Sequence, residues 1–191
     1  APNEAELYPQ PQTFKVTPDP ALDSILEGAF RPGFFQGVAT VVMKLFQCVF
    51  GQARGQGHAV FGQKDYQQLM VIRHMVQQFA MPITVHAGAT VRAEDGLALS
   101  SRNGYLSADE RTEAVNLSQA LRYMITHAQS GERDWAALET QAMATLQARG
   151  WAPDYMTVRR QADLQTPKDS DTDLVALGAA KLGPARLIDN W

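Results

Sequence analysis

The sequence has a single cysteine, no long hydrophobic run and no excess of positive charge. Cys48 has no partner for an internal disulfide, so we expect a buried thiol within the apolar stretch VVMKLFQCVF, as in a reducing compartment. No segment reaches about 18 uninterrupted apolar residues, which argues against a membrane span. The net charge of −3 over 191 residues argues against a broad nucleic-acid-binding surface.

The first 90 residues show the hydrophobic spacing of an α/β fold. Residues 35–50 are predicted to form a buried helix, because their apolar side chains share one broad face. Short strands are predicted at 58–62 and 82–87, with a helix over 64–79 between them, and this order predicts two parallel strands. The predicted buried face of the first helix comprises Val38, Val41, Val42, Leu45, Phe46 and Val49.

The character of the chain changes after residue 90. A long polar segment leads to Ser107 and Glu110, which have the spacing of a capping box, so a helix is predicted from there to about His127. A second helix is predicted over 135–149, and the sequences YMTVRR, DLVALGAAKL and ARLIDN predict three strands. We therefore predict part of a Rossmann-like parallel-sheet domain over residues 1–90 and a smaller α+β domain over residues 91–191.

The stretch FGQKDYQQL places charges and amides where a strand ends and a helix begins. Gly62 allows a ligand to approach the backbone closely, and backbone amides at a helix start favour an anion. Lys64 suits a phosphate, Asp65 could accept hydrogen bonds from sugar hydroxyls, and Gln68 lies one helical turn after Lys64. The alternative is an aspartate that offsets the helix dipole beside a solvated lysine.

The stretch LALSSRN is the second candidate for phosphate binding. Arg102 can hold two phosphate oxygens at once, and Ser100 and Ser101 can donate hydrogen bonds beside it. The alternative is a serine-rich turn that precedes a capped helix. Together with the FGQKD stretch, it forms the hypothesis that a nucleotide phosphate is held between the two segments.

Other polar residues are weaker candidates. The sequence GQGH at 55–58 lacks the first histidine of the H-x-G-H signature of nucleotidylyl transferases. The four histidines lack metal-ligand spacing, so no protein-held metal is predicted. Glu94 and Asp95 could meet a magnesium ion, or they could be solvated loop charges.

Several motifs resemble the pantoate–β-alanine ligase family. These are FGQKDYQQLMVIRHMV, VRAEDGLALSSRNGYLS, ARLIDN and LEGAFRPGFFQGVATVVMKLF. The resemblance implies a Rossmann-like ATP-binding domain closed by a smaller C-terminal domain. It also implies that ATP activates pantoate as an adenylate, with Mg²⁺ accompanying ATP, that β-alanine then displaces AMP, and that the protein is a cytoplasmic homodimer.

The resemblance also assigns roles to individual residues. Lys64, Ser100 and Arg102 would act in catalysis, with Lys64 near phosphate, Asp65 near ribose and Gln68 on pantoate. Val91 would contact adenine through its backbone, and the segment from Leu99 to Arg102 would be a flexible phosphate loop. The ATP-binding set would comprise Gly62, Gln63, Lys64, Asp65, Val91, Leu99, Ser100, Ser101 and Arg102.

The sequence also departs from the family pattern. This sequence lacks the P-T-M-G-x-L-H-x-G-H element, which carries the family's general acid. It also lacks a glutamine that binds substrate in the family, as though about 90 residues of the family were missing. Phe34 stands where the family has histidine in R-P-G-H-F, and the 51–57 loop is about five residues longer than usual. Two interpretations stay open: an enzyme of this family, or a non-catalytic remnant that binds nucleotide or a partner.

Overall fold

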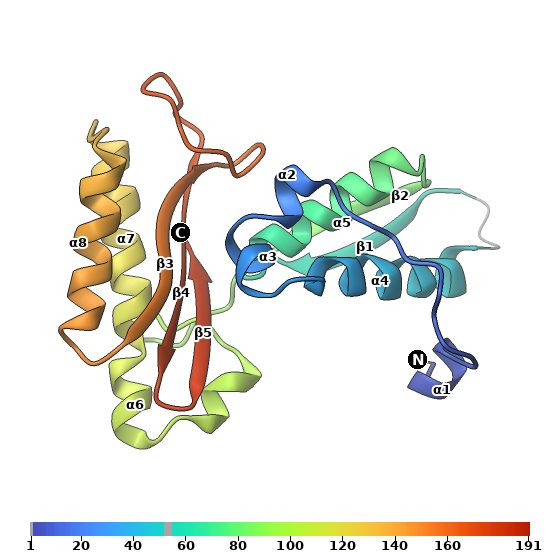
Figure 1. Ribbon diagram of the computed structural model, residues 1–191, viewed down its shortest axis with the longest axis horizontal. Coiled ribbons are helices and arrows are strands. Elements are labelled where there is room, and N and C mark those ends of the chain that lie inside the picture. The colour runs from blue at the N-terminus through green and yellow to red at the C-terminus, as the bar shows by residue number, and fades with distance from the viewer. Residues whose placement is uncertain (1, 52–54) are drawn as a thin grey trace. The chain divides into compact units, whose positions relative to one another are not determined.

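The computed structural model describes residues 2–51 and 55–191 and divides into two compact units (Figure 1). The first unit comprises Ala1–Phe61 and Gln67–Gly88. The second comprises Gly62–Tyr66 and Ala89–Trp191, so the GQKD stretch belongs with the C-terminal part of the chain. None of the helices in the described ranges is long and apolar enough to cross a membrane.

The first unit begins with four helices and contains a two-stranded sheet. The strands β1 and β2, which precede and follow α5 in the sequence, pair with each other in parallel. This confirms the predicted strand–helix–strand unit. Phe46 of α4 packs edge-on against Phe61 of β1, with ring centroids 6.1 Å apart. The elements are α1 (Glu4–Leu7), α2 (Pro20–Asp23), α3 (Leu26–Phe30), α4 (Phe34–Phe50), β1 (Gly57–Gly62), α5 (Tyr66–Gln78) and β2 (Ile83–Gly88).

The buried face of α4 is narrower than the sequence predicted. It consists of Phe35, Ala39, Thr40, Val42 and Phe46, whereas Val38, Val41 and Leu45 of the predicted face are only half-buried. The prediction of a buried thiol is wrong, because Cys48 is exposed. Two residues after Phe46 correspond to a rotation of about 200° around the helix, which turns the thiol away from the core. Val49 is exposed as well, since the buried face ends at Phe46.

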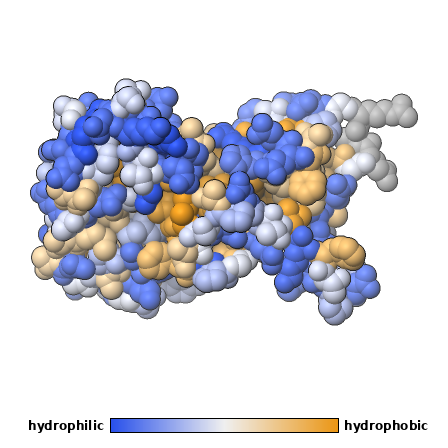
Figure 2. Space-filling view, turned by 45° about the horizontal axis from the view of Figure 1, so that its top comes forward, coloured by the Kyte–Doolittle hydropathy of each residue, from blue (hydrophilic) through white to orange (hydrophobic). Residues whose placement is uncertain are grey.

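Hydrophobic side chains also reach the surface of the first unit, where orange residues lie among blue ones in Figure 2. The helix predicted over 64–79 ends one residue earlier, because α5 ends at Gln78, and Phe79 is exposed. Val60 of β1 is exposed too. The predicted lengthening of the 51–57 loop falls largely on residues 52–54, which lie outside the described residues.

The second unit is an α+β fold. Its sheet has the order β3-β4-β5 and is antiparallel throughout, and α7 and α8 lie side by side on one face of it (Figure 1). With the parallel pair of the first unit, this confirms the predicted fold class. The elements are η1 (Ser101–Tyr105, a 3₁₀ helix), α6 (Ala108–Glu113), α7 (Val115–Gln129), α8 (Trp135–Gln147), β3 (Ala152–Arg160), β4 (Leu174–Leu182) and β5 (Ala185–Asn190).

The predicted capping box starts α6. The Ser107 hydroxyl accepts from the Glu110 amide at 3.2 Å, and the Glu110 carboxylate accepts from the Ser107 amide at 2.8 Å. The helix predicted to continue to about His127 is divided at Ala114, where α6 ends and α7 begins. The capping box therefore sets the boundary between the polar segment that carries Arg102 and the start of α6.

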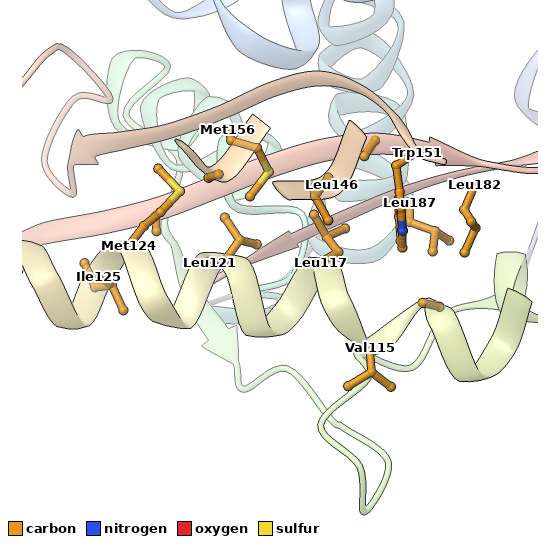
Figure 3. Packing of buried hydrophobic residues seen from close by; sticks show 14 of the residues in the cluster. Val115, Leu117, Leu121, Met124, Ile125, Leu146, Trp151, Met156, Leu182 and Leu187 are labelled. Atoms are coloured by element: carbon orange, nitrogen blue, oxygen red, sulfur yellow. The ribbon is translucent and has the colours of Figure 1, made fainter. Parts of the chain in front are cut away.

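The core of the second unit lies between α7, α8 and the sheet. Leu117, Leu121 and Met124 of α7 point toward the strands, where Met156 and Leu187 meet them (Figure 3). Leu121 and Met124 are completely buried. This packing supports β5, the strand from which the candidate site is held.

We expect Leu121→Ala to lower the free energy of unfolding of the second unit by about 2–5 kcal/mol, because it leaves a cavity in a close-packed core. Denaturant unfolding monitored by circular dichroism measures this change. Gln119→Ala, at an exposed position of the same helix, is the control and should change stability by less than about 0.5 kcal/mol. Equal effects of the two substitutions would contradict the described packing.

A carboxylate on α6 makes the stability of this unit depend on pH. Glu113 accepts from Arg149 Nε at 2.7 Å and Nη2 at 2.8 Å, and from the Trp151 indole at 3.0 Å. The hydrogen bond from Arg149, more than that from Trp151, holds the pKa of Glu113 below its ordinary value of 4.5. A carboxyl group whose pKa is lower in the folded state stabilises the fold at pH values above its unfolded-state pKa. This stabilisation is lost as the pH falls through the folded-state pKa.

Accordingly, Glu113→Gln should lower the free energy of unfolding at pH 7 by about 1 kcal/mol. The difference from the parent should shrink as the pH falls below 4.5 and vanish once the parent carboxyl is protonated. Urea unfolding at a series of pH values from neutral to acidic measures both curves. A difference that stays constant over the whole series would show that the ion pair is not its source.

Candidate functional site

The GQKD stretch forms a turn between β1 and α5. Gln63 and Lys64 lie in this turn, and Asp65 follows directly before the first residue of α5. The side-chain amide of Asn190, at the end of β5, donates to the Gln63 carbonyl at 3.0 Å and to the Lys64 carbonyl at 2.7 Å. The turn is therefore fixed to the C-terminal strand of the second unit.

The polar segment after residue 90 begins as a small antiparallel loop. The Leu99 amide donates to the Val91 carbonyl at 2.8 Å, and the Ala93 amide donates to the Leu97 carbonyl at 2.9 Å. Leu97 is buried in the core, whereas Val91 and Leu99 are exposed. The loop is thus anchored by one leucine and presents two predicted ATP-binding residues to solvent.

A buried ion pair holds this loop to β5. Arg92 donates to both carboxylate oxygens of Asp189, at 2.7 and 3.0 Å, and the Asp189 side chain is 4% exposed. The same guanidinium donates to the carbonyls of Gly96 at 3.1 Å and Asn190 at 2.9 Å. It also lies over the Trp191 ring, 4.4 Å from the centroid. These contacts satisfy a charge that would be costly to bury alone.

The SSR triplet leads into the 3₁₀ helix η1. The Ser100 hydroxyl accepts from the Arg102 amide at 3.2 Å, which caps η1. Arg102 Nη1 donates to the Arg186 carbonyl of β5 at 3.1 Å, and the Asn103 side-chain amide donates to the Ala98 carbonyl at 3.1 Å. The predicted loop from Leu99 to Arg102 is therefore held to β5 through the Arg102 guanidinium, although the Arg102 side chain remains exposed.

These segments carry both cations and carboxylates, and Asp65 follows Lys64 directly. Arg92 is paired with Asp189 and Arg111 is paired with Asp95. In the described ranges, neither Lys64 nor Arg102 has a carboxylate partner. The Lys64 turn contacts β5 at Asn190 and Arg102 contacts it at Arg186, so the prediction that both bind phosphate rests on their charge and on the absence of such a carboxylate partner among the described residues.

Asp95 is already engaged by a cation. Arg111 donates to it at 2.8 Å, and this hydrogen bond is the main reason that the pKa of Asp95 lies below its ordinary value. The structure therefore favours the interpretation of Asp95 as a paired loop charge over that of a magnesium ligand.

The structure places nine of the ten predicted site residues in the second unit. Gln68, the predicted pantoate ligand, lies in α5 and belongs to the first unit. The nine in the second unit are Gly62, Gln63, Lys64, Asp65, Val91, Leu99, Ser100, Ser101 and Arg102.

Three residues that were not among the predicted site residues hold these segments together: Arg92, Asp189 and Asn190. The motif ARLIDN gave a signal, because it ends in two adjacent polar residues, Asp189 and Asn190. Buried polar side chains of this kind need partners, so such a pattern indicates a specific contact. The spacing of 97 residues between Arg92 and Asp189 could not identify that partner.

Two further features lie in the first unit. Phe34, the residue at the position of histidine in the R-P-G-H-F pattern, begins α4. The Arg31 guanidinium carbon lies over the Phe34 ring, 3.4 Å from the ring centroid. His58 of β1 and His86 of β2 lie 2.9 Å apart between ring nitrogens. No group of three or more histidine, cysteine or acidic residues in the described part of the chain is placed to hold a metal ion.

Comparison with known proteins relates the whole chain to one family. The family model described as pantoate-beta-alanine ligase matches residues 1–191. The chain is 62% identical over 194 residues to the pantothenate synthetase of Paracidovorax citrulli (strain AAC00-1), covering 100% of this chain and 68% of that protein. It is 62% identical over 192 residues to that of Verminephrobacter eiseniae (strain EF01-2), with the same coverage of 100% and 68%.

Solved structures similar to this chain belong to the same family. Pantothenate synthetase from Thermus thermophilus matches with a TM-score of 0.89 and 40% identity, over 100% of this chain and 67% of that one. A pantoate-beta-alanine ligase from Francisella tularensis, complexed with beta-gamma ATP and beta-alanine, matches with a TM-score of 0.75 and 28% identity, over 98% and 61%. The chain thus spans about two thirds of the length of these relatives.

Proposed function

Because the chain belongs to the pantoate-β-alanine ligase family, we propose that it ligates pantoate and β-alanine to pantothenate with ATP, through a pantoyl adenylate. The observation that carries this proposal is the pair of uncompensated cations, Lys64 and Arg102, on two segments that contact β5. A triphosphate is an anion that such a pair can bind.

In the first step, a carboxylate oxygen of pantoate attacks the α-phosphorus of ATP. The new P–O bond forms as the bond to pyrophosphate breaks, and negative charge grows on the phosphate oxygens. Lys64 and Arg102 stabilise this charge, and the hydroxyls of Ser100 and Ser101 donate beside them. Ser100 can do so because its oxygen accepts from the Arg102 amide while its own proton stays available.

In the second step, the amine of β-alanine attacks the carbonyl carbon of the adenylate. The C–N bond forms, the C–O bond to AMP breaks, and the amine loses a proton. The roles of the remaining residues follow the family: Gln68 holds pantoate, Asp65 accepts from the ribose hydroxyls, and Val91 contacts adenine through its backbone.

Magnesium would enter this site with the nucleotide. Mg²⁺ keeps several waters and binds mainly through substrate phosphates, so it does not require the protein-built cluster that is absent from the described residues. The magnesium ion would supply further charge neutralisation on the phosphates. We also propose that the protein is a cytoplasmic homodimer, as the family resemblance implies.

Exchange of labelled pyrophosphate into ATP tests the proposal. The adenylate step is reversible, so label should enter ATP when pantoate is present and should not when it is omitted. Slow but pantoate-dependent exchange would support an enzyme of this family. ATP binding without any exchange would support the non-catalytic remnant instead, and exchange that is independent of pantoate would indicate a different adenylate-forming reaction.

A further inference from the structure

Asn190 connects the end of β5 with the turn that carries Lys64. Its side chain is almost fully buried, and its amide group has two N–H donors. One amide nitrogen serves both the Gln63 and Lys64 carbonyls, at 3.0 and 2.7 Å. Two consecutive carbonyl groups of the turn therefore point toward the same side chain.

This arrangement fixes the direction of the next two backbone amides. In a planar trans peptide the C=O and the following N–H point in opposite directions. Since the carbonyls of Gln63 and Lys64 face Asn190, the N–H groups of Lys64 and Asp65 face away from it. Successive N–H groups that point to one side form a concave anion-binding surface.

Asn190 is itself held in place. Its backbone N–H donates to the Asp189 carboxylate at 2.8 Å, and its carbonyl accepts from Arg92 at 2.9 Å. Asp189 and Arg92 form the buried bidentate pair, and Arg92 also holds the loop that leads to Ser100 and Arg102. The end of β5 thus holds the Lys64 turn directly and the loop before Ser100 through Arg92, while Arg102 itself contacts Arg186 near the start of β5.

We propose that Asn190 is a positioning residue of the nucleotide site, which orients the Lys64 turn toward phosphate, with the Arg92–Asp189 pair as its support. This inference rests on the proposed function, because it takes the phosphates of ATP as the ligand. Asn190 acts through the turn and does not touch the nucleotide. Its removal should weaken binding of the phosphates more than binding of the nucleoside, whose ribose is proposed to meet only the Asp65 side chain of this turn.

The test is Asn190→Ala, with ATP and adenosine affinities measured by calorimetry. Loss of the two hydrogen bonds should weaken ATP binding about tenfold, whereas adenosine affinity should stay within about twofold. Backbone ¹⁵N relaxation should show increased motion at Lys64 and Asp65 and no change in β3. If Asn190→Ala does not fold, Asn190→Ser, which keeps one donor on a shorter side chain, should show the same pattern.

Thr157→Ala is the matched control. Thr157 is also buried and hydrogen-bonded in the second unit, to Glu139 and Arg159, but it does not contact the turn. Thr157→Ala should lower the melting temperature and leave the ratio of ATP affinity to adenosine affinity unchanged.

Equal loss of ATP and adenosine affinity in Asn190→Ala, or unchanged backbone motion at Lys64 and Asp65, would overturn the positioning role. If the parent binds no ATP, the proposed function is wrong, and ¹⁵N relaxation alone then decides whether Asn190 orders the turn.

Discussion

A polypeptide of residues 1–191 is expected to release AMP roughly 10²–10⁴-fold more slowly than an ordinary enzyme that turns over about 1–10 times per second. The family resemblance implies that an H-x-G-H element supplies the general acid and that another glutamine binds pantoate and β-alanine. Neither occurs in this sequence, and loss of one positioned acid accounts for that range. A coupled assay for AMP with pantoate, β-alanine and ATP measures the rate.

The pantothenate synthetase of Paracidovorax citrulli, at 62% identity, is the natural control in the same assay. Fusing the N-terminal third of that protein ahead of residue 1 should restore turnover if residues 1–191 keep a working ATP site. Ordinary turnover by residues 1–191 alone would overturn the prediction. A fused protein that binds ATP but stays inactive would favour the non-catalytic remnant.

Arg102→Ala and Lys64→Ala should each weaken ATP binding about tenfold or more. Each removes a charge-assisted contact of roughly 1.5–3 kcal/mol to a phosphate. Adenylate formation should slow further if the contact strengthens in the transition state. Calorimetry with ATP and single-turnover adenylate formation measure the two effects.

Val91→Leu is the control, because the contact proposed for Val91 is through its backbone and its side chain is exposed. It should bind ATP like the parent. A loss as large as that of Arg102→Ala would show that the Val91 side chain contributes to the site.

The sequence predicted the elements with strong local signals. The strand–helix–strand unit, the Ser107 capping box and the three C-terminal strands each follow from short-range spacing, and the structure confirms them. Burial at helix ends was harder to predict. Cys48 and Phe79 continue apolar patterns but lie where the helix turns away from the core or has ended, and only tertiary packing determines this.

In the candidate site too, local patterns predicted some features, whereas others depend on long-range contacts. Charge and hydroxyl patterns near Lys64 and Arg102 indicated phosphate binding without reference to the rest of the chain. The contacts that organise these segments are long-range, such as Asn190 with Lys64 and Asp189 with Arg92. Local patterns carry no information about such pairs, so the supporting residues became visible only in the folded chain.

The most direct test of the account is whether Lys64 and Arg102 act on one phosphate chain. ATP affinity should be measured for the parent, Lys64→Ala, Arg102→Ala and the double variant. We predict that each single variant loses about tenfold and that the double variant departs from the product of the two losses, because neighbouring groups on one ligand are coupled. If both single variants bind ATP like the parent, the two segments do not form a nucleotide site and the central claim is wrong.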